Sequence, residues 1–278
     1  MIDFLHLPKP QNGTIDYFPG FSDTTGGSWE VWNKPRGINF IKIITISGGG
    51  GGSGLGGGGG GSASMATVMI PAIFLPDQLY VSSGVGGRGS ANTTASNGVA
   101  SYVSIAPSNA AIYRVCYGNG GGAGQPDSAG GGTAGALPIV TSALQAGMGN
   151  FTGLIGQVGA NGSDTLTAAG SITYPTTGLL LSGGAGGGGA SFAGGDIIAP
   201  ASQTSTYTIF PTLPGASGSD NGLAGVNNME LLLFTGGSGG GPSDGNGGDG
   251  GFGCGGGGAG GNGTGGNGGP GLVIISSW

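Results

Sequence analysis

Short apolar runs, each bounded by glycine, proline or asparagine, dominate the hydrophobic pattern of this chain. The clearest is 38–47, whose two alternating faces are both largely apolar apart from Lys42. Alternation with period two indicates a strand, and apolar residues on both faces indicate that the strand is covered on both sides. It leads without a break into the glycine run 48–61.

The same pattern predicts further short strands and almost no helix. Strands are expected around Ile15, Tyr17, Trp29 and Val31 and over 79–82, 102–105, 112–117, 179–181, 207–210, 229–234 and 270–278. One short helix is expected around 141–146, because glycine and β-branched residues dominate elsewhere. The most apolar stretch, 65–76, is about half the length that a membrane span needs and contains Pro71, so no membrane insertion is predicted.

Glycine changes the picture most, with 74 residues of 278, in runs near 48–61, 84–89, 118–135, 183–195 and 236–271. Such a composition is often disordered, but disordered chains are usually charged and poor in apolar residues. Here 36% of residues are hydrophobic and only 6% are charged. We therefore predict that the glycine runs are ordered.

Ordered glycine runs can adopt the threefold polyproline II helix and, with no Cβ between them, bond to one another through their backbones. Glycine loops threading between strands are the alternative. The run 236–271 lacks the strict Gly-X-Y register of collagen. The predicted fold is mainly β: antiparallel strands combined with a glycine-rich polyproline II-like bundle over 29–278, after an N-terminal attachment segment, 1–28.

Charge and candidate chemistry exclude several functions. Six Lys and Arg against twelve Asp and Glu give a net charge of −6, which disfavours nucleic acid as a partner. His6 is the only histidine, so a catalytic cluster of acids and bases is hard to build, and we predict no enzyme, cofactor or metal site. Cys116 and Cys254 are expected to be buried free thiols rather than a disulfide.

Both ends of the glycine-rich region resemble the glycine-rich domains of phage tail proteins. The first part is Trp29-Glu-Val-Trp-Asn-Lys-Pro35-Arg-Gly37-Ile-Asn-Phe-Ile-Lys-Ile-Ile-Thr-Ile-Ser-Gly48, an aromatic strand, a Pro-x-Gly turn and an aliphatic strand entering polyglycine. The second is Gly268-Gly-Pro270-Gly-Leu-Val-Ile-Ile-Ser-Ser-Trp278. In composition and run structure the chain also resembles the tail-fibre-tip adhesins of T-even-type phages.

The resemblance implies a virion structural protein, an exposed tail-fibre or receptor-binding adhesin component on the virion surface, assembled in the host cytoplasm. Its expected partners are other virion proteins and a host surface glycan or outer-membrane protein. A capsid-exterior decoration or head-fibre protein is the alternative reading. An ice-binding protein is a remote one, since it would need a flat face of regularly spaced small residues.

In the adhesin interpretation the receptor is bound by insertions between the glycine runs, because loops on a rigid scaffold are free to vary. The candidate insertions are 91–97, 136–148, 200–214 and 220–228, with Tyr207, Phe210, Asn92, Asn97, Asn227 and Asn228 as receptor-contact candidates. Trp29 and Trp32 are expected in the core. Asp220, Asp244 and Asp249 are interpreted as solvated loop acids rather than a calcium site.

Overall fold

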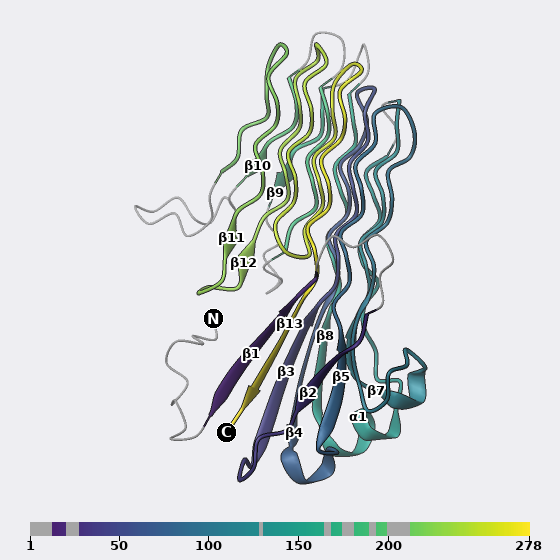
Figure 1. Ribbon diagram of the computed structural model, residues 1–278. Helices are drawn as coiled ribbons and strands as arrows, with labels where there is room; N and C mark the ends of the chain where they lie inside the picture. Colours follow the sequence, from purple (N-terminus) through teal and green to yellow (C-terminus); the bar gives the residue numbers. More distant parts are fainter. Residues whose placement is uncertain are drawn as a thin grey trace.

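The chain folds into a β-sandwich whose strands continue into a bundle of glycine runs. The computed structural model describes residues 13–20, 28–127, 130–163, 168–173, 181–188, 193–198 and 212–278. In Figure 1 the sandwich forms the lower half, and the glycine runs lie side by side along the length of the upper half. The predicted mainly β architecture, with antiparallel strands, is confirmed.

The larger sheet has five strands in the order β1-β13-β3-β4-β8, all antiparallel. They are β1 (Thr14–Pro19), β3 (Phe40–Ile46), β4 (Met65–Pro71), β8 (Asn150–Leu154) and β13 (Leu272–Ser277). The first strand of the sequence therefore pairs along its whole length with the last, Thr14 opposite Ser277. This places β1, which lies in the segment assigned to attachment, within the sheet.

The smaller sheet has four antiparallel strands in the order β2-β5-β6-β7. These are β2 (Glu30–Asn33), β5 (Gln78–Ser82), β6 (Ser101–Ser104) and β7 (Arg114–Gly118). A bulge interrupts the register of β6 and β7 next to Ser104. The strands predicted over 38–47, 79–82, 102–105 and 270–278 are thus confirmed, whereas β4 and β8 were not predicted.

The core fills the space between the two sheets, and a second cluster covers the other face of the larger sheet. Ile41 and Ile43 of β3 point into the first cluster, and Ile44 and Ile46 point into the second. The prediction that this strand is covered on both faces is confirmed. Fully burying an aliphatic side chain contributes about 1.5–3 kcal/mol, so the doubly covered β3 is a main source of stability.

The two cysteines lie in different clusters, Cys116 in the first and Cys254 in the second, and both are free. Burial raises the pKa of each thiol to about 12. The expectation of two buried free thiols is confirmed.

The glycine bundle is held by backbone hydrogen bonds that repeat every three residues. In the run 48–53, successive N–H groups donate in rotation to three neighbouring runs, 96–99, 266–269 and 58–61, which lie antiparallel to it. Successive carbonyl groups accept in rotation from three others, 121–124, 87–90 and 256–259, which lie parallel. These bonds measure 2.8–3.1 Å. One run thus has six neighbours and leaves none of its twelve backbone groups unpaired.

A period of three is the period of polyproline II, although that conformation stays a prediction for these runs. Six-neighbour packing explains why the runs are glycine. A Cβ on Gly50 would overlap the carbonyl of Gly122, and one on Gly255 would overlap the carbonyl of Gly60. Between the inner runs small side chains, such as that of Ser62, are fully buried, whereas the outer runs enclose an apolar cluster that includes Ile172, Ile197 and Leu233.

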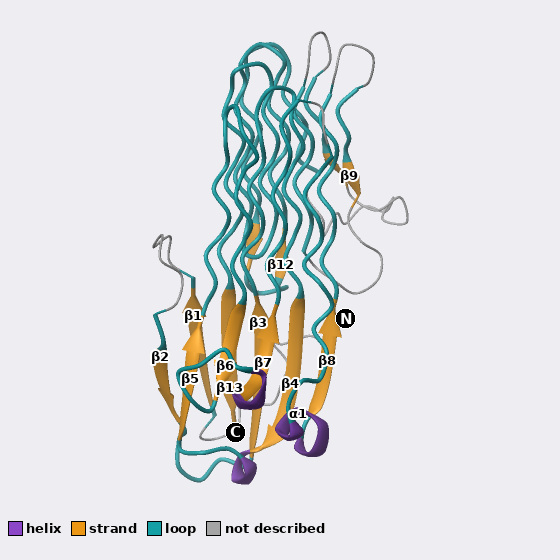
Figure 2. Cartoon of the chain, turned by 90° about the vertical axis from the view of Figure 1, so that its right-hand side faces the viewer, coloured by secondary structure: helices purple, strands orange, loops and turns teal. Residues whose placement is uncertain are grey.

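Short elements complete the described part of the chain. The predicted helix is α1 (Ala143–Met148), which begins in a capping box of Ser142 and Gln145, and two 3₁₀ turns span Ala72–Phe74 and Ala111–Tyr113. The outer runs contain two-residue strands: β9 (Ile172–Thr173), β10 (Ile197–Ile198), β11 (Asn227–Asn228) and β12 (Leu233–Phe234). Figure 2 shows the helical turns at the end of the sandwich farthest from the bundle.

Four predicted strands need correction or lie outside the described residues. The strand predicted over 112–117 begins only at Arg114, because 111–113 form a 3₁₀ turn. The strand predicted over 229–234 is wrong for its first part, because 229–232 form the turn that joins β11 to β12. The strands predicted over 179–181 and 207–210 lie wholly or mostly outside the described residues. Within the described ranges the chain has no helix with the length and apolar character of a membrane span.

Candidate functional site

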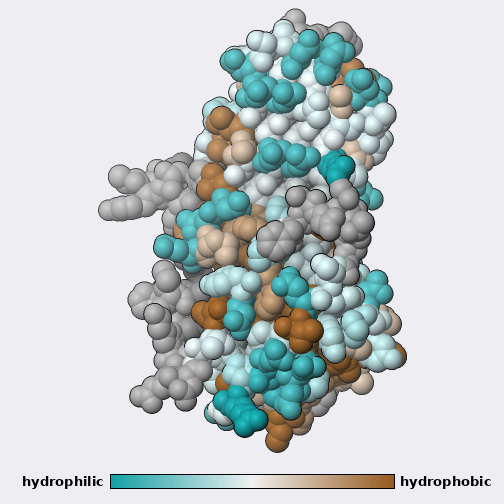
Figure 3. Space-filling view, viewed as in Figure 1, coloured by the Kyte–Doolittle hydropathy of each residue, from teal (hydrophilic) through white to brown (hydrophobic). Residues whose placement is uncertain are grey.

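The turns of the bundle gather at the end away from the sandwich, and we call this end the distal face. It comprises the turns 53–57, 90–94, 125–127, 217–220, 242–245 and 261–263. Figure 1 shows these turns together at the top of the molecule, and Figure 3 shows mostly polar side chains over that end.

Hydrogen bonds between turns hold the distal face together. Leu55 donates its N–H to the carbonyl of Gly261 at 2.9 Å, and Thr94 Oγ1 donates to Gln125 Oε1 at 2.9 Å. Ser243 donates its N–H to the carbonyl of Gly218 at 2.8 Å. Segments as far apart in the sequence as Leu55 and Gly261 thus form one surface, and the bundle beneath supports it.

One flank of the bundle is closed by Asp and Asn side chains that accept hydrogen bonds from the next run. Asn246 Oδ1 accepts from the N–H of Thr264 at 2.8 Å, and Asn221 Oδ1 accepts from the N–H of Asn246 at 2.9 Å. Asp249 Oδ1 accepts from the N–H of Asn267 at 2.7 Å. These side chains supply acceptors to outward N–H groups that have no further run beside them.

The acids that could have suggested a cation site belong to this flank or to the distal face. Asp244 Oδ1 accepts from both the N–H and Nδ2 of Asn262, and Asp249 Oδ1 accepts from Asn267 in the same way. No group of three potential metal ligands occurs among the residues that the structure describes. The geometry gives Asp244 and Asp249 a structural role, which the Asn-Gly and Asp-Gly spacing of the run could have indicated.

The structure separates the predicted receptor-contact residues. Asn92 is exposed on the distal face, but Asn97 lies in the run below it and accepts from the N–H of Ala123 at 2.8 Å. Asn227 and Asn228 lie on β11, at the other end of the outer runs, and accept from the N–H groups of Phe252 and Leu231. Tyr207 and Phe210 lie outside the described residues.

The candidate insertions are equally dispersed. The insertion 91–97 begins on the distal face, whereas 136–148 contains α1 at the sandwich end. The insertion 220–228 starts on the distal face and runs away from it to β11, and 200–214 lies mostly outside the described residues. The distal face therefore takes its other turns from the glycine runs themselves, which sequence reasoning did not single out.

A second candidate site is the outer face of the four-stranded sheet, which we call the aromatic face. It comprises Trp29, Asn33, Gln78, Tyr80, Tyr102 and Arg114. Trp32, by contrast, points into the core and is 4% exposed, as predicted, while Trp29 is only half-buried. The rings of Trp29 and Tyr102 lie 6.4 Å apart, and Arg114 Cζ lies 5.2 Å from the Tyr102 centroid.

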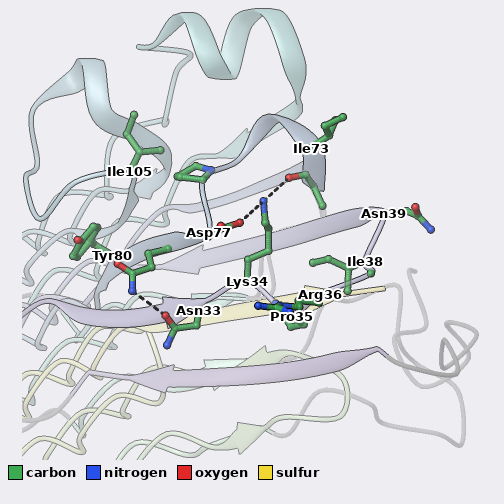
Figure 4. Close-up of a pocket in the computed structure, with 14 residues that line it drawn as sticks. Asn33, Lys34, Pro35, Arg36, Ile38, Asn39, Ile73, Asp77, Tyr80 and Ile105 are labelled. Carbon is green, nitrogen blue, oxygen red and sulfur yellow. Dashed lines mark hydrogen bonds and ion pairs between the residues drawn. The ribbon is translucent and has the colours of Figure 1, made fainter.

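The aromatic face continues into an open groove of about 970 Å³ at the end of the sandwich. Figure 4 shows Tyr80 and Ile105 at one end of this groove and Ile73 at the other, with Lys34 and Asp77 between them. Asn33 and Gln78 are hydrogen-bonded to each other at 3.1 Å along its side.

Comparison with protein families identifies the chain as a member of a family defined by its glycine-rich domain. The family model for the glycine-rich domain matches residues 24–278, and the chain belongs to this family. The match begins close to the predicted boundary at residue 29 and includes both the sandwich from β2 onward and the bundle. A comparison with curated proteins finds no significant match.

Proposed function

We propose that this protein is a virion structural component of a bacteriophage, exposed on the tail fibre, and that its distal face contacts the host receptor. The resemblance of residues 29–52 and 268–278 to phage tail glycine-rich domains suggests the particle. The distal face suggests the task, since many turns are held at one end of a rigid support.

The observation that carries the proposal is the contrast between the runs and their turns. Inside the bundle a single Cβ would overlap a backbone carbonyl, as at Gly50. On the distal face Asn92 and Ser219 are exposed, so their side chains can be replaced without disturbing a run. A receptor-binding protein needs this combination of a fixed frame and replaceable contact residues.

The expected partners are a host surface glycan or outer-membrane protein at the distal face and other virion proteins elsewhere. A capsid-exterior decoration protein is the alternative, and in that case the distal face would contact no cell. The flank of Asp and Asn side chains carries charged groups such as Asp249, so the regular face of small residues expected of an ice-binding protein is not favoured.

The test is binding of the fluorescently labelled full chain to a panel of candidate host bacteria, with phage adsorption competed in parallel. We expect saturable binding that Asn92→Arg and Ser219→Arg abolish, because each places a long cation on the distal face. Asn150→Arg, at an exposed position on β8, is the matched control and should bind like the unmodified protein. Absence of binding, with intact particles still carrying the chain, would favour the capsid alternative.

A further inference from the structure

The aromatic face carries three half-buried aromatic rings on the outer side of the four-stranded sheet. The strand register places Tyr80 opposite Val31 and Ser104, and Tyr102 opposite Ser82 and Tyr117. Residues alternating with these, such as Leu79 and Val103, point into the core. Trp29, Tyr80 and Tyr102 therefore present their rings outward, each partly exposed.

Polar side chains accompany the rings on the aromatic face. The side-chain amides of Asn33 and Gln78 lie beside Tyr80 and supply both donors and acceptors. The hydroxyl of Ser104, between Tyr80 and Arg114 in the register, has no hydrogen-bond partner but is 0% exposed, so the ligand contacts are assigned to the exposed amides. Binding sites for small molecules typically combine aromatic rings with a few such convergent polar groups.

Cations gather around the aromatic face and its groove, although the chain as a whole is negatively charged. The protein has a net charge of −6, but three of its six cations, Lys34, Arg36 and Arg114, border the aromatic face and its groove. Asp77 is the acid among the described residues that line the groove. The neighbouring acid Glu30 pairs with Val81 and so belongs to the opposite side of β2.

Two arginines lie at opposite edges of the aromatic face. Arg114 lies over Tyr102 and Tyr117, with Cζ 5.2 and 4.7 Å from the ring centroids, and its Nε donates to the carbonyl of Asn109. Arg36 is exposed in the turn that borders the groove. Guanidinium groups bind carboxylates through paired hydrogen bonds, so one arginine at the groove and one at the far edge strand of the aromatic face favour a ligand that carries more than one carboxylate.

The side chain of Lys34 holds the groove in its shape by donating hydrogen bonds to backbone carbonyl groups. Lys34 Nζ donates to the carbonyls of Leu75 at 2.6 Å and Ala72 at 3.2 Å and lies 3.3 Å from Asp77 Oδ1. These contacts fix the turn at 34–39 against the segment 72–77. The volume of the groove, about 970 Å³, lies at the upper end of the range of roughly 300–1,000 Å³ for ligand pockets.

We propose that the aromatic face and its groove bind an acidic saccharide chain. Apolar faces of the sugar rings stack on Tyr80 and Trp29, the amides of Asn33 and Gln78 bond to hydroxyls, and Arg36 and Arg114 bind carboxylates, Arg114 from its position over the Tyr102 ring. This site is separate from the distal face, and the inference does not depend on whether the chain belongs to a phage particle.

The test is titration of the full chain with hexamers of galacturonic acid and of sialic acid, and with a neutral glucose hexamer, by isothermal calorimetry. We expect at least one acidic hexamer to bind, with the neutral hexamer weaker by about tenfold or more, and binding to weaken as salt rises. Arg36→Gln and Tyr80→Ala should each raise the Kd by about tenfold or more.

Two control variants separate binding from folding. Tyr80→Phe keeps the ring and should bind like the unmodified protein, and Arg88→Gln removes an exposed cation of the bundle without affecting the aromatic face. Binding of neither acidic hexamer, equal binding of the neutral one, or acidic binding that Arg36→Gln and Tyr80→Ala leave unchanged would each overturn the proposal. Adhesion through the distal face would survive all three results.

Discussion

The indole Nε1 of Trp32 donates a hydrogen bond to Oδ2 of Asp16 at 2.8 Å. Trp32 lies on β2, an edge strand of the four-stranded sheet, and Asp16 lies on β1, an edge strand of the five-stranded sheet. This bond therefore closes one side of the sandwich between two strands that do not pair with each other.

Replacing Trp32 by phenylalanine should destabilise the sandwich. The change removes the hydrogen bond to a charged acceptor, worth about 1.5–3 kcal/mol, and leaves part of the indole volume empty. Urea denaturation of the two proteins measures the difference. In Asp16→Asn the indole packing is unchanged and an acceptor oxygen remains, so a smaller loss is expected. No loss at all in Asp16→Asn would indicate that packing alone accounts for the effect of Trp32→Phe, and an equal loss in both variants would indicate that the charge of Asp16 does.

Replacing a glycine inside the bundle by alanine should lower the free energy of unfolding far more than replacing an exposed glycine. The Cβ of Gly50→Ala overlaps the carbonyl of Gly122, and no side chain can move to relieve it, so we expect a loss of about 3 kcal/mol or more. Gly147 lies in α1 with open space around it, and Gly147→Ala should stabilise by roughly 0.5–1 kcal/mol. Thermal unfolding of both variants checks the contrast, which similar melting temperatures would contradict.

The buried thiols predict a loss of stability at alkaline pH. Burial raises the pKa of Cys116 and Cys254 from 9.0 to about 12 in the folded chain. Above pH 9 the unfolded chain releases these protons while the folded chain keeps them, so the free energy of unfolding should fall as pH rises from about 9 towards 12. The double variant Cys116→Ala, Cys254→Ala should show a shallower fall between pH 8 and 11.

The same burial predicts that a thiol reagent at pH 8 reacts with neither cysteine in the folded protein and with both after denaturation. Rapid labelling of the native chain would show that one of the two sites is open to solvent.

Removing an acceptor from the Asp and Asn flank should release the neighbouring run locally. Asp249→Ala leaves the N–H of Asn267 without its acceptor at 2.7 Å and should cost about 1 kcal/mol. Amide hydrogen exchange should show faster exchange at Asn267, while Gly50 in the interior stays protected. Asp249→Asn keeps an acceptor oxygen, and faster exchange in that variant as well would indicate that the charge, not the geometry, holds the run.

Much of the sandwich could be predicted because apolar side chains within short segments define its strands. The alternation in 38–47 and the aliphatic end of the chain at Leu272–Ser277 correspond directly to β3 and β13. β4 was not predicted, because its apolar residues continue through Pro71 into 65–76 and show no clear strand boundary. The pairing of β1 with β13 could not be predicted from the sequence either, since paired residues such as Thr14 and Ser277 are 263 residues apart.

Sequence by itself predicted that the glycine runs are ordered, that apolar strands flank them, and that the chain is mainly β. Only the tertiary structure decided which runs are neighbours, which turns form the distal face, and which rings form the aromatic face. The reason is physical: a glycine has no side chain, so nothing in a run identifies its partner. The partner is selected by the strand that the run continues and by backbone hydrogen bonds to segments far away, as between Gly50 and Gly256.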